Sequence, residues 1–226
     1  MDKIIFTGGS GILGTEIQKI NGHNILFPSS KIFDVLNIEQ CEEYIKNNHI
    51  DCIIHAAAFT NTKVAETNFM KAIDINIIGT INLIKLCNKY SIKLVYISTD
   101  YVFDGQKGDY SADEPINPLS KYAKSKAAAE LAVRMSDNFL IIRTSFFAKE
   151  FPYDKAFIDQ YSTKDYVDIM APKILQACLF DTIGIKHIYS DKETIFEKAK
   201  KRKPQVIPIQ IKDFEGIKIP KDISLK

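Results

Sequence analysis

The sequence predicts an α/β fold built on a doubly wound parallel sheet, and two observations carry this prediction. Short apolar runs rich in β-branched residues alternate with longer helical patterns over residues 1–145, as expected for parallel strands buried on both faces by helices. The first apolar run also leads directly into a turn with three evenly spaced glycines, which opens a helix. We expect strands at residues 4–6, 24–27, 51–55, 93–97 and 139–142, and helices at 11–20, 37–47, 63–90 and 120–135.

The rest of the chain is less regular. It is expected to form a helix at 169–180, a short strand at 187–189 and, from the capping-box pair Ser190 and Glu193, a helix through Lys201. The proline-containing tail has room for short edge strands only. We therefore divide the chain into a sheet domain, residues 1–145, and a small irregular lobe, residues 146–226, which packs on it and does not fold independently.

Composition excludes several classes of protein. The chain has 226 residues, 46% of them hydrophobic, and a net charge of +2, so nothing attracts it strongly to nucleic acid or to anionic lipid. The four cysteines lie far apart, which favours free thiols in a reducing compartment and no metal site. No apolar run approaches the ~20 residues that a membrane span needs. We expect a cytoplasmic protein, and we interpret the basic run from Lys198 to Lys203 as a solvated helix end.

The glycine turn is the most informative stretch. Gly8, Gly11 and Gly14 stand three residues apart between a predicted strand and a predicted helix. In a dinucleotide-binding Rossmann fold, the first glycine allows a sharp turn, the second lets a diphosphate approach the helix N-terminus, and the third packs helix against sheet. Ser10, Ile12 and Leu13 belong to the same turn. The sequence therefore predicts a dinucleotide cofactor here.

The end of the second strand bears on which dinucleotide is bound. An acidic residue usually takes the adenosine ribose hydroxyls at this point, but the chain reads Phe27-Pro28-Ser29-Ser30-Lys31. Hydroxyls with a lysine suit a 2′-phosphate, so NADP(H) is preferred and NAD(H) remains an alternative, because Ser-Ser-Lys is also ordinary loop chemistry.

The third strand ends in His55 followed by Ala56, Ala57 and Ala58. Small side chains at the carboxyl end of a parallel strand leave room for a ligand. His55 is either catalytic or a buried structural group, and we favour the structural interpretation.

Tyr122 and Lys126 lie four residues apart on the helix expected at 120–135, which places them on one helical face. A phenol titrates near pH 10, and a neighbouring ammonium would lower that pKa and bring proton transfer into range. Thr99, at the end of the fourth strand, supplies a hydroxyl that could hold a carbonyl oxygen.

These pieces together resemble an extended short-chain dehydrogenase/reductase, and within that superfamily the dTDP-4-dehydrorhamnose reductases. The matching segments are Thr7 to Gly14, His55 to Asn61, Ala65-Glu66, Ser98 to Gly105, Asn117-Pro118-Leu119 with Tyr122 to Lys126, and Arg143-Thr144-Ser145. A weaker similarity follows at Asp159-Gln160-Tyr161, Tyr166-Val167-Asp168 and residues 220–225.

The resemblance implies a nucleotide-sugar reductase that passes a hydride from NADP(H) to a 4-keto-6-deoxy sugar. Tyr122 would protonate the alkoxide, Lys126 would tune Tyr122 and hold the ribose, and Thr99 would orient the ketone. The implied substrate contacts are Thr99, Asp100, Tyr101 and Phe146. The implied cofactor contacts are Gly8, Ser10, Gly11, Ile12, Leu13, Gly14, Ser29, Ser30, Lys31, Asp34, Val35, Ala56, Ala57, Ala58, Thr60, Asn76, Ser98, Tyr122, Lys126 and Thr144. A homodimer is an expectation from the family only.

Several positions depart from the family pattern. The related 4,6-dehydratases carry a glutamate where Tyr101 stands, so a dehydratase is disfavoured. His55 replaces an asparagine, Lys63 an aspartate and Phe146 a tryptophan. Only 13 residues separate Ser145 from Asp159, where the family has a longer stretch with a helix. Two alternatives therefore stay open: a reductase of another carbonyl substrate, and a non-catalytic NADP-binding regulatory protein.

Overall fold

The computed structural model describes residues 3–20, 22, 24–216 and 218–226. Its centre is a six-stranded sheet in the order β10-β5-β4-β3-β1-β2, in which every neighbouring pair is parallel. The strands are β1 (Ile4–Thr7), β2 (Ile25–Leu26), β3 (Cys52–His55), β4 (Lys93–Thr99), β5 (Phe139–Thr144) and β10 (Gly184–His187). The predicted doubly wound parallel sheet is confirmed.

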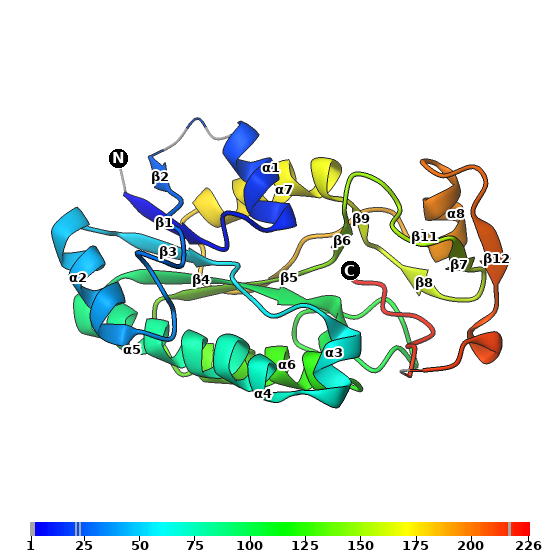
Figure 1. Ribbon diagram of the computed structural model, residues 1–226, viewed down its shortest axis with the longest axis horizontal. Helices are drawn as coiled ribbons and strands as arrows, with labels where there is room; N and C mark the ends of the chain where they lie inside the picture. The colour runs from blue at the N-terminus through cyan, green and yellow to red at the C-terminus, as the bar shows by residue number, and fades with distance from the viewer. Residues whose placement is uncertain (1–2, 21, 23, 217) are drawn as a thin grey trace.

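Helices cover both faces of this sheet (Figure 1). One face carries α1 (Ile12–Ile20) and α7 (Val167–Leu179), and the other carries α2 (Ile38–Asn48), α5 (Gly79–Tyr90) and α6 (Lys121–Val133). Successive strand residues point to opposite faces. Ile54 therefore packs under α1 and α7, while Ile53 packs on the side of α2 and α5.

The helical stretch predicted at 63–90 is interrupted. It comprises α3 (Thr62–Thr67), the single turn α4 (Met70–Ala72), a π-helical segment η1 (Ile73–Ile78) and α5. None of the helices in the described part of the chain combines the length and hydropathy needed to cross a membrane.

The loop after β2 is shaped by α2. Asn37 caps α2 by accepting a hydrogen bond from the Gln40 amide at 3.0 Å. The Gln40 side chain does not reach back to Asn37, as a capping box requires, but accepts from the Asp34 amide and donates to the Lys31 carbonyl. Gln40 thus fixes the fold of residues 31–34 at one wall of the site described below.

The C-terminal lobe consists of short pairings at the far end of the molecule from β2 (Figure 1). They join β6 (Phe146–Phe147) to β9 (Asp165–Tyr166), β7 (Lys155–Phe157) to β12 (Ile207–Ile209), and β8 (Tyr161–Ser162) to β11 (Glu193–Thr194), beside helix α8 (Ile195–Lys200). Short 3₁₀ turns follow β4 and β12: η2 (Asp100–Val102) and η3 (Ile211–Asp213). The division at residue 145 remains a prediction, and α7 and β10 return from beyond it to the central sheet.

The shortened segment after Ser145 contains no helix in the described chain: residues 146–158 hold the strands β6 and β7. The strand predicted at 187–189 lies earlier, at Gly184–His187, and pairs in parallel with β5. Its only large apolar residue is Ile185, so the hydrophobic pattern gives little sign of a sheet edge.

The capping-box prediction at Ser190 was wrong. The N-cap of α8 is Thr194, whose hydroxyl accepts from the Glu197 amide while Glu197 accepts from the Thr194 amide. Ser190 instead donates its hydroxyl hydrogen to Asp165 at 2.8 Å. Two capping patterns follow each other in this stretch, at residues 190–193 and 194–197, and the pairing of β11 with β8 selects the later one.

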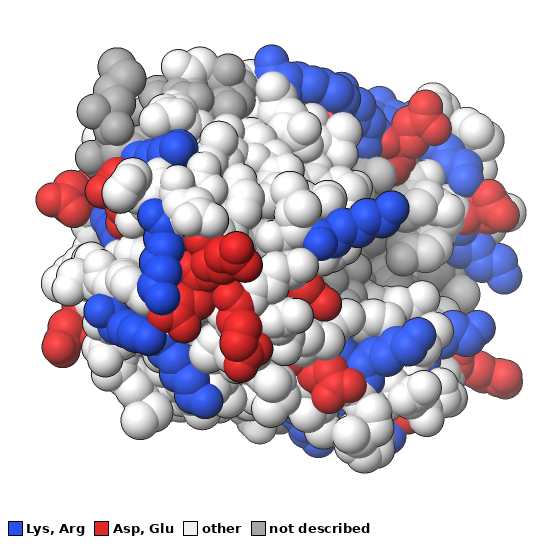
Figure 2. Space-filling view, turned by 60° about the vertical axis from the view of Figure 1, so that its left-hand side comes forward, with Lys and Arg blue, Asp and Glu red and all other residues white. Residues whose placement is uncertain are grey.

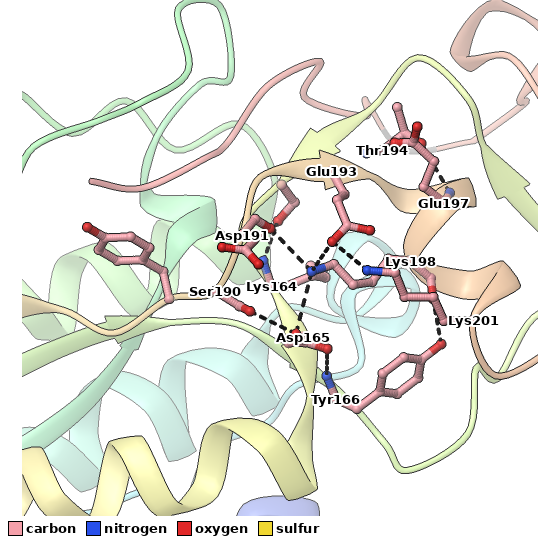
Figure 3. Close-up of polar contacts among 12 residues, drawn as sticks. Lys164, Asp165, Tyr166, Ser190, Asp191, Glu193, Thr194, Glu197, Lys198 and Lys201 are labelled. Carbon is pink, nitrogen blue, oxygen red and sulfur yellow. Dashed lines mark hydrogen bonds and ion pairs between the residues drawn. The ribbon is translucent and has the colours of Figure 1, made fainter.

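Lys198 also differs from its prediction, because it is buried rather than solvated. Its ammonium lies 3.3 Å from Glu193, 3.5 Å from Asp165 and 3.2 Å from the Asp191 carbonyl oxygen (Figure 3). A buried cation must be paired to be tolerated. These ion pairs connect Lys198 of α8 to Asp165 of β9 and to Glu193 of β11.

His55 is structural, and its hydrogen bonds fix its tautomer. The Thr80 hydroxyl donates to the Asn76 carbonyl at 2.7 Å, so it accepts from Nε2–H of His55 at 3.0 Å. Nδ1 of His55 then accepts from the Thr7 hydroxyl at 2.8 Å, and the Thr7 oxygen accepts from the Ala57 amide. The neutral imidazole thus ties the end of β1, just before Gly8, to α5.

This arrangement predicts an acid-dependent loss of stability. Burial lowers the pKa of His55 from 6.5 to about 3, with Lys126 adding to the effect. The unfolded chain therefore takes up a proton below its pKa of 6.5 that the folded chain refuses, so stability falls as the pH drops from 6.5 towards 3. In urea unfolding between about pH 7 and about pH 4.5, wild type should lose up to about 1.4 kcal/mol per pH unit more than His55→Asn.

The matched control is His49→Asn. His49 is exposed and has a φ of 52°, a conformation that asparagine tolerates. Its pH profile should follow wild type. Parallel profiles for wild type and His55→Asn would contradict a neutral buried His55.

Candidate active site

A cleft of about 2410 Å³ lies over the carboxyl ends of the central strands and extends to the C-terminal lobe. It includes the point between β1 and β3 where the strand order reverses, at which open α/β sheets bind ligands. Pockets for single small molecules occupy roughly 300–1,000 Å³. The cleft is therefore large enough for a dinucleotide and a second ligand together.

Most of the predicted site residues line this cleft. They are Gly8, Ser10, Gly11, Ile12, Leu13, Gly14, Ser29, Ser30, Asp34, Val35, Ala56, Ala57, Ala58, Thr60, Ser98, Thr99, Tyr101, Tyr122, Lys126, Thr144 and Phe146. Three predicted residues, Lys31, Asn76 and Asp100, are not among its lining residues.

The three glycines have distinct steric environments that match their predicted roles. Gly8 has a φ of +78°, and a Cβ atom there would lie 2.8 Å from the Ala57 nitrogen. A Cβ atom on Gly14 would lie 2.5 Å from the Gly8 carbonyl oxygen, so α1 could not approach the turn. At Gly11 the described chain offers only the Gly8 oxygen, at 3.2 Å. That leaves open space where a phosphate could approach the start of α1.

The loop after β2 presents hydroxyls to the cleft. Ser29 and Ser30 are exposed on its wall. Lys31 is exposed beside them, with its carbonyl oxygen held by Gln40. Asp34 also lines the wall, but one of its carboxylate oxygens accepts from the Leu36 amide at 3.0 Å. The wall thus presents two exposed hydroxyl-bearing residues at its rim, with the exposed Lys31 next to them.

Asn76, which does not line the cleft, forms hydrogen bonds with residues that lie next to it. It is buried in η1, where its side chain accepts from the Phe59 amide at 2.7 Å and donates to the Phe59 carbonyl and the Ser125 hydroxyl. These bonds occupy its amide group. Asn76 therefore holds the loop after β3 against α6 and lies behind the cleft wall.

Thr99 and Asp100 form a buried polar pair at the end of β4, and the half-buried Tyr122 faces them from α6. The Thr99 hydroxyl donates to Asp100 at 3.2 Å and accepts from the Tyr101 amide. Burial raises the pKa of Asp100. Burial also raises the pKa of Tyr122 above its usual range, with a further contribution from Asp100, while a hydrogen bond with Thr99 opposes the shift.

Lys126 occupies the same face of α6 but is held elsewhere. Its ammonium donates to the Ile97 carbonyl at 2.8 Å and lies 4.1 Å from the centre of the Tyr96 ring. Burial lowers the pKa of Lys126 to about 7, against the attraction of Glu130. The expected lowering of the Tyr122 pKa is therefore not seen in this arrangement, because the ammonium is engaged with β4.

The orientation of α6 depends on residues that sequence reasoning missed. Glu130, one turn beyond Lys126, pairs with Arg143 on β5 at 2.6 Å, and both side chains are fully buried. Ser98 donates its hydroxyl hydrogen to the same carboxylate at 2.8 Å. A charged residue after the apolar run of β5 is the only sequence signal of this pair. Lys164, which also lines the cleft, was missed as well.

Thr144 lines the cleft at the end of β5. Its side chain is buried, and its hydroxyl oxygen has no hydrogen-bond partner within the described residues. Buried hydroxyl groups nearly always have a partner. A ligand that enters the cleft could supply one, which fits the glycine turn and the open space at Gly11.

The burial of Lys126 predicts an unusual pH dependence of stability. Its pKa of about 7 in the folded chain lies below the ordinary 10.5, so the unfolded chain binds more protons between these values and stability rises with pH across this range. In urea unfolding, Lys126→Met should be more stable than wild type near pH 7. The difference should shrink by up to about 1.4 kcal/mol per pH unit towards about pH 10.

Lys124→Met is the control, because Lys124 lies on the exposed face of the same helix. It should leave the pH profile unchanged. A difference between Lys126→Met and wild type that is constant with pH would refute the depressed pKa.

Comparisons with known proteins agree with this geometry. The family described as "RmlD substrate binding domain" matches residues 2–174. The dTDP-4-dehydrorhamnose reductase of Aggregatibacter actinomycetemcomitans is 31% identical over 182 residues, 77% of this chain and 62% of that protein. The methionine adenosyltransferase 2 subunit beta of Mus musculus is 30% identical over 141 residues, 58% of this chain and 42% of that protein. The chain thus spans less than two thirds of the length of these relatives.

The alignment with one solved structure extends over more of both chains. The crystal structure of dTDP-4-dehydrorhamnose reductase from Bacillus anthracis str. Ames, in complex with NADP, aligns with a TM-score of 0.91 at 27% identity. The alignment covers 100% of this chain and 91% of that chain. Because the family match extends over more than half of the sequence and the fold agrees, the chain belongs to the RmlD substrate-binding domain family.

Proposed function

We propose that this chain is an NADPH-dependent reductase of a nucleotide-activated 4-keto-6-deoxy sugar, with the mechanism of the short-chain dehydrogenases/reductases. The observation that carries the proposal is the meeting of Thr99, Tyr122 and Lys126 in one cleft with the glycine turn. The relative from Aggregatibacter actinomycetemcomitans and the solved structure from Bacillus anthracis are both dTDP-4-dehydrorhamnose reductases, and the latter is in complex with NADP.

The cofactor half of the cleft is assigned to residues 1–145. The glycine turn would hold the diphosphate, and Ser29, Ser30 and Lys31 would hold a 2′-phosphate. NADPH, when bound, supplies a hydride to the carbonyl carbon of the substrate. Lys126 would exchange its bond with the Ile97 carbonyl for the hydroxyls of a ribose, and Thr144 would gain the partner that it lacks.

The chemical half is assigned to Thr99 and Tyr122. Their hydroxyls would bind the carbonyl oxygen, and Tyr122 would give its proton to the alkoxide that forms. A high pKa keeps Tyr122 protonated and able to donate before reduction. The lobe, residues 146–226, would supply the remaining substrate contacts together with Tyr101 and Phe146. We further propose a cytoplasmic location and a homodimer.

The direct test uses purified protein with NADPH and a dTDP-4-keto-6-deoxy sugar, followed by loss of NADPH absorbance. Tyr122→Phe removes the proton donor, so kcat should fall roughly 10²–10⁴-fold while NADPH still binds, because the other cofactor contacts remain. Tyr189→Phe, a change at an exposed tyrosine, is the control and should behave as wild type.

Two outcomes would favour the alternatives. Oxidation of NADPH with an unrelated ketone alone would indicate another carbonyl substrate. Cofactor binding without turnover on any carbonyl would indicate a regulatory protein, an alternative that the similarity to the murine adenosyltransferase subunit keeps open.

The residues after β2 lead to a prediction about which cofactor, NADPH or NADH, binds more tightly. NADPH should bind at least several-fold more tightly than NADH, since Ser29, Ser30 and Lys31 offer donors and a positive charge to a 2′-phosphate. Ser29→Asp should weaken NADPH binding and leave NADH binding the same or tighter, because a carboxylate repels the phosphate and accepts from ribose hydroxyls. Calorimetric titration measures both. Equal affinities of wild type for the two cofactors would refute the role of this loop.

A further inference from the structure

Lys164 is a half-buried lysine in the cleft that the proposed mechanism does not use. It lies between β8 and β9 and lines the cleft on the side of the C-terminal lobe. Its ammonium is 5.2 Å from the centre of the Tyr101 ring and 4.9 Å from that of Phe147. Both rings attract a cation held near their faces.

No carboxylate in the described part of the chain forms an ion pair with Lys164. Among the residues that the structure describes, no carboxylate oxygen lies within 4.0 Å of its ammonium, unlike the buried Lys198, which has two carboxylate partners. Burial alone would lower the pKa of Lys164, but the nearby Tyr101, Asp100 and Tyr153 outweigh burial and raise the pKa. The group therefore stays cationic at neutral pH, and its neighbours are the ring of Phe147 and the ring and hydroxyl of Tyr101.

The segment that carries Lys164 is held firmly. Its own amide donates to the Ser162 hydroxyl at 3.1 Å. The next residue, Asp165, accepts from the Tyr166 amide and the Ser190 hydroxyl, and it pairs with Lys198 (Figure 3). β9 also pairs with β6 through Asp165 and Phe146. The backbone at Lys164 is therefore ordered before a ligand binds, so binding need not order this segment.

The position of Lys164 points to the substrate rather than to the dinucleotide. Its ring contact Tyr101 follows Thr99 by two residues, and its other ring contact, Phe147, belongs to the lobe. We propose that Lys164 binds an oxyanion group of the substrate, an assignment that rests on the proposed function of the cleft. Two sources share this chemistry: the diphosphate of a nucleoside diphosphate sugar, and a carboxylate on the sugar ring.

The test measures binding by calorimetry with defined probes. The variants are Lys164→Met, which keeps the length of the side chain and removes its charge, and Lys164→Arg, which keeps the charge. Lys85→Met is the matched control, because Lys85 is exposed on α5. The probes are dTDP against thymidine for the diphosphate, UDP-glucuronate against UDP-glucose for the carboxylate, and NADPH as a measure of the intact fold.

If the diphosphate is the ligand, Lys164→Met should weaken dTDP binding about tenfold or more. Thymidine and NADPH should be unaffected, Lys164→Arg should retain most of the affinity, and Lys85→Met should match wild type. If the carboxylate is the ligand, the loss should appear with UDP-glucuronate and be absent with UDP-glucose and dTDP.

Unchanged affinities for every probe in Lys164→Met would overturn the proposal, and so would a wild-type protein that binds neither anionic probe. These results differ from failure of the proposed function. A Lys164-dependent affinity for dTDP in a protein that never oxidises NADPH would leave the anion site in place and refute the reductase.

Discussion

The ion pair between Glu130 and Arg143 fixes the helix on which the candidate chemistry stands. It joins α6 to β5 at 2.6 Å with both side chains fully buried, and Arg143 also donates to the Ala112 carbonyl and stacks over Phe103. Breaking such a pair by removing one partner costs about 3–5 kcal/mol, because it leaves a buried charge. Rotation of α6 about its axis would break it, so Tyr122 and Lys126 stay directed at the cleft.

This constraint explains why α6 carries charge on its buried face. Lys126 and Glu130 both point at the sheet, where apolar side chains would pack more favourably. The loss of stability at Lys126 is consistent with its proposed place beside a cofactor, because stability is commonly traded for function at such sites. Charged residues on α6 and β5 are thus the part of the core that serves the site rather than the fold. The surface differs from this buried region: Figure 2 shows basic and acidic side chains intermingled over one face of the molecule.

The sequence predicts those features of the fold that depend on residues close together in the chain. The glycine turn and the five main strands follow from backbone sterics and apolar periodicity. It does not predict features that depend on contacts with residues far away in the chain. Thr194 replaced Ser190 as the cap because β8 pairs with β11, and Lys198 is buried because Asp165 and Glu193 surround it. For the same reason Asn76 could be recognised as important but not as a residue that holds Phe59.

The two halves of the cleft therefore depend on different kinds of interaction. The cofactor half is built from continuous βα units whose geometry is fixed along the chain. The lobe is built from strands of two or three residues, too short to be stable as isolated pairs. It depends instead on ties between distant segments, such as Gln160 to the Pro220 carbonyl and Tyr161 to Asp222. Lys164 lies among these ties, so the part of the site that would select the substrate is the part that local patterns cannot predict.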